Sequence, residues 1–85
     1  MVPISPFWFK QRQCKAEPAG EDILRVSGPN LGEAFLFIKP EGRQWRAGLR
    51  KALDGPDIAV TEPELPSPQD AWDAAFELYR IHFIV

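Results

Sequence analysis

The side chains that most often carry enzyme chemistry are scarce in this sequence. Nucleophilic catalysis needs a serine or cysteine beside a histidine that an acidic group orients, and a zinc site needs several cysteine, histidine or carboxylate ligands at fixed spacings. The chain has one cysteine, Cys14, and one histidine, His82. Neither residue lies at a spacing from other possible ligands that is typical of a metal site. We therefore expect no catalytic site, no metal site and no cofactor.

Basic side chains near two phenylalanines give the strongest indication of binding. If residues 41–54 form a helix, three arginines lie along one side of it, and the planar guanidinium group suits phosphate or carboxylate oxygens. If they form a strand, Arg46 and Arg50 point away from the core, beside Phe35 and Phe37, as on a surface that stacks single-stranded nucleic acid. An ordinary solvated face is the alternative to both. The candidate residues for binding a partner or a polyanion are Arg43, Arg46, Arg50, Lys51, Phe35 and Phe37.

The charges are divided unevenly along the chain. Residues 1–51 hold nine Lys or Arg against five Asp or Glu, whereas residues 52–85 hold one against seven. Blocks of opposite sign can attract each other within a monomer, pair two copies, or bind a polyanion. The pI near 5.3 argues against a dedicated nucleic-acid binder, which is usually basic. We expect a non-catalytic module whose charged surface binds another protein or a second copy, with nucleic-acid binding as the alternative.

No segment of the sequence is typical of membrane insertion or export. The longest apolar run, residues 34–38, is far shorter than the roughly 20 residues that span a bilayer. The first six residues contain two prolines and no basic group, unlike a secretion signal. We expect a cytoplasmic protein with no membrane partner.

The length of 85 residues suits one small domain, with residues 1–6 as an extended N-terminal arm. Residues 7–15 are expected to form a strand, with Phe7 and Phe9 on one face and Trp8 and Lys10 on the other. Residues 18–20 are expected to form a turn. Residues 23–26 and 34–38 are β-rich runs separated by Gly, Pro and Asn, which predicts a hairpin. The second run is apolar on both faces, so we expect it to be central and covered on both sides, or else to expose Phe35 and Phe37.

Residues 41–54 fit two patterns. Trp45, Ala47 and Leu49 alternate as in a strand, whereas Trp45, Leu49, Ala52 and Leu53 also follow the spacing of a helix. Gly55 stands where many helices end, although Gly48 disfavours a helix interior by about 1 kcal/mol. We favour the helix.

The end of the chain has the clearest pattern. A short strand is expected at residues 57–61. Ser67 is a helix N-cap followed by Pro68 at the first helical position, and aromatic residues then recur every three or four positions to Phe83. The sequence thus predicts an α+β two-layer sandwich with a three- to four-stranded sheet and two helices on one face. The alternative is a β-meander of four to five strands closed by one C-terminal helix.

Overall fold

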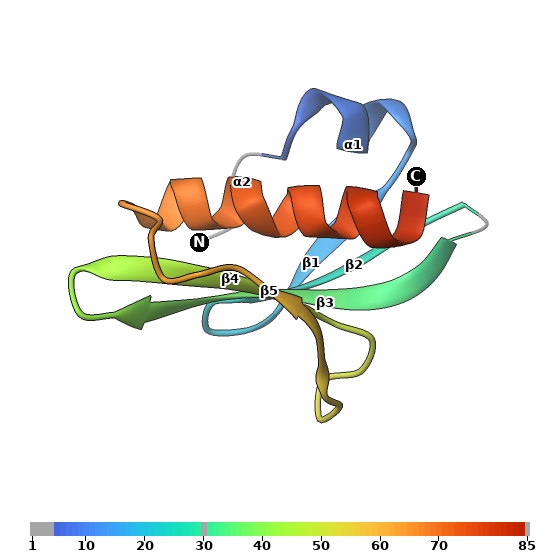
Figure 1. Ribbon diagram of the computed structural model, residues 1–85. Coiled ribbons are helices and arrows are strands. Elements are labelled where there is room, and N and C mark those ends of the chain that lie inside the picture. The colour runs from blue at the N-terminus through green and yellow to red at the C-terminus, as the bar shows by residue number, and fades with distance from the viewer. Residues whose placement is uncertain (1–4, 30, 85) are drawn as a thin grey trace.

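The computed structural model describes residues 5–29 and 31–84. Its strands form one antiparallel sheet in chain order, with a helix lying across one face (Figure 1). The strands are β1 (Lys15–Gly20), β2 (Ile23–Gly28), β3 (Leu31–Glu41), β4 (Gln44–Arg50) and β5 (Asp57–Val60). The helical elements are α1 (Phe7–Gln11), α2 (Pro68–Tyr79) and the π-helical segment η1 (Arg80–Ile84).

The α+β class is confirmed, and the arrangement is that of the predicted alternative. A five-stranded meander is closed by one long helix, α2. The favoured version, with three to four strands and two helices on one face, is wrong in both numbers. Each strand runs antiparallel to its neighbour in the sheet.

The largest correction concerns residues 41–54, where the expected helix is strand β4. Ala47 and Leu49 are buried beneath α2, and Trp45 packs on the same core. The segment forms a strand because β4 pairs along its whole length with β3, from Phe35↔Arg50 to Glu41↔Gln44, and pairs with β5 on its other side. A strand paired on both sides satisfies its backbone groups fully.

Two corrections fall near the N-terminus. Residues 7–11 form the short helix α1, whereas a strand was expected from residue 7 to 15. Residues 18–20 end the edge strand β1 instead of forming a turn. Proline is tolerated on an edge strand because its missing N–H can face solvent. The predicted extended arm falls mostly on residues 1–4, which lie outside the described residues.

The other predicted elements are confirmed. β2 and β3 pair as an antiparallel hairpin, and β5 lies within the segment expected to be a strand. Ser67 caps α2, since its Oγ accepts a hydrogen bond from the Asp70 N–H at 3.1 Å. No helix in the described part of the chain is long and apolar enough to cross a membrane.

The core lies between the sheet and the helices. We call the side of the sheet beneath α2 the covered face. From α1, the Phe9 ring packs edge-on against Phe76 of α2, with centroids 5.0 Å apart, and also contacts the Tyr79 ring. The Tyr79 hydroxyl is buried without a hydrogen-bond partner in the structure. Burial, with a smaller contribution from Cys14, raises the pKa of Tyr79 to about 12.

Candidate functional site

No helix formed by the described residues lies on the second side of the sheet (Figure 1), and we call this side the open face. Strand side chains alternate between the two faces, so the register assigns each residue to one of them. The open face carries Ile23 and Arg25 of β2, Phe35, Phe37 and Lys39 of β3, Arg46, Gly48 and Arg50 of β4, and Val60 of β5. The β4–β5 register shifts between Leu49 and Arg50, and Ile58 is assigned to this face by its alternation with Ala59 and its exposure.

An apolar row crosses the open face at its centre. Register places Ile23, Phe37, Gly48 and Val60 side by side on four neighbouring strands. The Phe37 ring lies over Gly48, since a Cβ atom at this position would overlap the ring. The missing side chain therefore creates the space that Phe37 occupies. Val60, at the end of the row, is 43% exposed, and Ile58 beside it is 41% exposed.

Arg50 covers Phe37 and links the row to β5. Its guanidinium carbon lies 4.5 Å from the centre of the Phe37 ring, a cation–π distance. Its Nε donates a hydrogen bond to Asp57 Oδ1 at 2.6 Å. This leaves Arg50 with both an aromatic and an acidic partner, and its charge is largely compensated.

The other arginines of the open face also have acidic partners. Arg46 pairs with Glu41 at 3.2 Å. Arg25 donates a hydrogen bond to Glu17, which raises the pKa of its guanidinium group, and it lies 3.7 Å from Glu33. The three arginines therefore do not form an uncompensated basic patch.

A shallow depression of about 300 Å³ lies beside the Phe37 ring. Ile23, Phe37 and Arg50 line it from the sheet. Lys39 and the acidic pair Glu21 and Asp22 also contribute to its walls. It offers a partner an apolar surface with charges of both signs around it.

Four of the six candidate binding residues share the open face: Arg46, Arg50, Phe35 and Phe37. Arg43 lies in the turn between β3 and β4, and Lys51 follows the end of β4, so neither belongs to the apolar row. The helical stripe of Arg43, Arg46 and Arg50 was wrong, because the segment is a strand.

Sequence reasoning missed three apolar residues of the open face, the half-buried Ile23 and the exposed Ile58 and Val60. Each alternates with a residue of the covered face, namely Leu24 for Ile23 and Ala59 for the other two. A strict period-2 assignment of β2 and β5 would have indicated them.

The scarce reactive groups do not come together as a catalytic set. Burial raises the pKa of the Cys14 thiol, and nearby Arg12 offsets only part of the effect. A raised pKa makes the thiol a poorer nucleophile at neutral pH. His82 is exposed on η1. Within residues 5–29 and 31–84, no three His, Cys, Asp or Glu residues are grouped to hold a metal ion.

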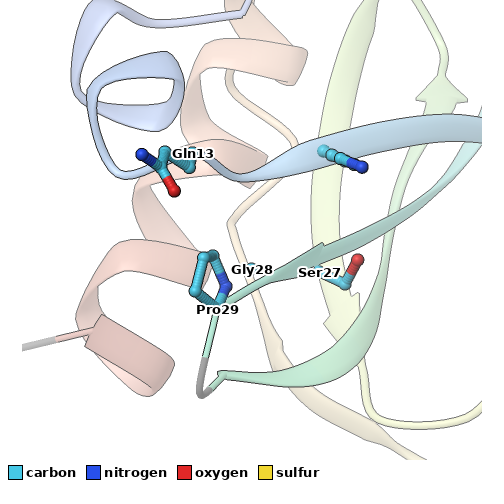
Figure 2. Close-up of a pocket in the computed structure, with 5 residues that line it drawn as sticks. Gln13, Ser27, Gly28 and Pro29 are labelled. Carbon is cyan, nitrogen blue, oxygen red and sulfur yellow. The ribbon is translucent and has the colours of Figure 1, made fainter.

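A second depression, of about 270 Å³, lies where α1 joins β1 (Figure 2). Gln13 lies on one side of it, and Gly28 and Pro29 lie on the other. Lys15 and Ser27 complete the lining. The lining has one ionisable side chain, so it lacks an acid–base pair.

The chain has no match among protein-family models, curated proteins or solved structures.

Proposed function

We propose that the protein is a small, non-catalytic, cytoplasmic interaction module that binds another protein through the open face. The observation that carries this proposal is the apolar row from Ile23 to Val60 with Ile58 beside it, since Ile58 and Val60 are each more than 40% exposed. Apolar groups that share one surface, with polar groups at the rim, are typical of protein interaction sites. The depression beside Phe37 would accept an anchoring side chain of the partner.

The chemistry of the surface favours a protein partner over nucleic acid. Nucleic-acid affinity comes mainly from cations that neutralise phosphates. On the open face Arg25, Arg46 and Arg50 already have carboxylate partners. A partner with an apolar centre and few charges would bury Ile58 and Val60 without breaking these ion pairs.

Capture by an immobilised protein from extracts of its native cells tests the proposal. The Val60→Lys variant places a charge in the apolar row, where the wild-type side chain is 43% exposed. We expect specific, saturable capture by the wild type and its loss in this variant. Ile81→Lys is the matched control, because Ile81 is an exposed apolar residue of η1, outside the sheet. Equal capture by both variants would contradict the proposal.

Nucleic-acid binding is the second candidate, and the stacking of Arg50 on Phe37 beside Phe35 supports it. Fluorescence anisotropy with labelled single- and double-stranded oligonucleotides at low salt tests it. Nonspecific binders typically show dissociation constants of ~10⁻⁴ M or tighter at physiological salt. We expect no signal at protein concentrations of about 100 µM. A signal that weakens steeply with salt would favour this candidate.

A further inference from the structure

A pocket of about 350 Å³ adjoins the depression beside Phe37 at the β1–β2 turn, since Glu21, Asp22 and Ile23 line both. Trp45 of β4 and Trp72 of α2 contribute to its wall, together with Ile38 of β3. Glu21 and Asp22, in the β1–β2 turn, are the only ionisable side chains that line it. Its size lies at the lower end of the range for small-ligand sites, ~300–1,000 Å³.

Each wall of this pocket is held by contacts outside it. The Asp22 carbonyl accepts a hydrogen bond from the Ile38 N–H at 3.1 Å, which fixes the turn against β3. Trp45 and Leu65 exchange two backbone hydrogen bonds of 2.8 and 3.2 Å. Trp72 is 7% exposed and belongs to the core. The pocket is therefore present before any ligand arrives, which lowers the entropy cost of binding.

The two carboxylates are available to a ligand. None of the ion pairs among the described residues involves Glu21 or Asp22. Two neighbouring negative charges repel each other, and a positive ligand would relieve that repulsion. Indole is also the best aromatic partner for a cation, and the pocket has two.

The adjoining end of α2 is a poor site for an anion. Helix N-termini bind anions through free N–H groups. Here Pro68, which also lines the pocket, has no N–H, and the Asp70 N–H already donates to Ser67 Oγ. Asp70 adds a negative charge in the first turn. The whole lining therefore discriminates against anions.

We propose that this pocket binds a small organic ammonium ion, with Trp45 and Trp72 against its alkyl groups and Glu21 and Asp22 close to its charge. The shared chemistry is an alkylated or primary ammonium group, either of a free small molecule or of a lysine side chain. The site shares Glu21 and Asp22 with the depression beside Phe37, but Trp45 and Trp72 line this pocket alone. The proposal does not depend on the function proposed for the open face.

Choline is the probe, and the three indole N–H resonances of the ¹⁵N-labelled protein are the readout. We expect the Trp45 and Trp72 resonances to shift and saturate, while the Trp8 resonance stays in place. A ligand of this size should bind with a dissociation constant of about 1–10 mM. The neutral analogue 3,3-dimethyl-1-butanol has the same shape as choline without its charge, and it should bind at least roughly threefold more weakly, as the lost cation–π term implies. N-acetyl-lysine methylamide forms a second arm that tests the lysine source.

Charge-removing variants complete the test. Asp22→Asn should weaken choline binding about two- to fivefold, as expected for a partly exposed charge pair, and Glu21→Gln should act in the same direction. Asp22 has a φ of 59°, a conformation that asparagine adopts readily, so the turn should be preserved. Asp54→Asn, in the exposed loop between β4 and β5, is the matched control. The proposal is overturned if neither ammonium probe shifts the two indoles, if the neutral analogue binds equally well, or if Asp22→Asn and Glu21→Gln leave binding unchanged in folded protein.

Discussion

The two faces of the sheet are built from the same strands and differ in almost every other respect. The covered face contributes buried aliphatic side chains such as Leu24, Leu36 and Leu49, and the structure describes no buried charged residue among them. The open face pairs each of its arginines with a carboxylate and leaves Ile58 and Val60 in solvent. The apolar side chains of the covered face are buried within the chain, whereas the open face leaves Ile58 and Val60 partly exposed.

This difference separates stability from recognition. Burying a large apolar side chain contributes about 1.5–3 kcal/mol, whereas an exposed ion pair contributes about 0–1 kcal/mol. Substitutions on the covered face should therefore lower the free energy of unfolding strongly, whereas most of those on the open face should change it little. Phe37 and Gly48 are the exception, because their contact is packed like a core although it lies on the open face.

The largest effect is expected on the covered face. Phe76 is 1% exposed and packs against the Phe9 ring. Phe76→Ala should lower the free energy of unfolding by about 3–5 kcal/mol, because it leaves a cavity between α1, α2 and the sheet. Urea denaturation followed by circular dichroism measures this. A loss below about 1 kcal/mol, the size of a surface change, would contradict the assignment of stability to this face.

Gly48→Ala tests the packed contact on the open face. The new Cβ would occupy the position of the Phe37 ring, so the ring must move or the strands must separate. We expect a loss of about 1–3 kcal/mol, the usual range for overpacking. The double variant Gly48→Ala with Phe37→Ala should lose less stability than the sum of the losses in the two single variants, since the clash between the new Cβ and the ring is absent. If the effects of the two substitutions simply add, the ring does not lie over Gly48.

Tyr79 provides a pH test of the covered face, and it is the only tyrosine of the chain. The unfolded side chain ionises with a pKa near 10, whereas burial raises the folded value to about 12. The unfolded state therefore loses its proton first. The contribution of Tyr79 to the free energy of unfolding should be fully present below about pH 10 and decline as the pH rises towards 12.

Tyr79→Phe is the control for this titration. The variant should lack the Tyr79-dependent part of the decline. At neutral pH it should be more stable by about 1 kcal/mol, because the hydroxyl that it removes is buried without a partner. A less stable variant would indicate that the hydroxyl has a hydrogen bond in solution.

The smallest effect is expected for the ion pair of Arg50 and Asp57. A double-mutant cycle with Arg50→Met and Asp57→Asn should give a coupling of about 0.2–1 kcal/mol, because both side chains are partly exposed. Chemical denaturation of the four proteins measures it. A coupling above about 3 kcal/mol would place this pair among buried ion pairs and make the open face a second source of stability.

The sequence was informative where one pattern was unopposed. Ser67 and the aromatic stripe that follows it defined α2, and the Gly, Pro and Asn residues between two β-rich runs defined the β2–β3 hairpin. Residues 41–54 fit two periods at once, and only tertiary pairing decides between them. Gly48 was the available indication, because a glycine in the middle of a strand often marks a close approach by another group. Here that group is Phe37, which no local pattern reveals.

The candidate site could be predicted only in part, for the same reason. Its arginines and phenylalanines were visible as residue types, but their grouping depends on the register of β3 and β4. Ile58 and Val60 became part of the site because β5 pairs with β4. The acidic partners of the arginines come from neighbouring strands and loops, so the near-neutral character of the surface was not visible in the sequence.

Site-specific photo-cross-linking in the native cells tests the central claim most directly. A photoreactive amino acid would replace Ile58 of the open face in one protein and Ile81 of η1 in another, two apolar side chains that are 41% and 51% exposed. Adducts with a distinct protein should form from position 58 and not from position 81. Adducts from position 81 alone, or from both positions equally, would contradict the account.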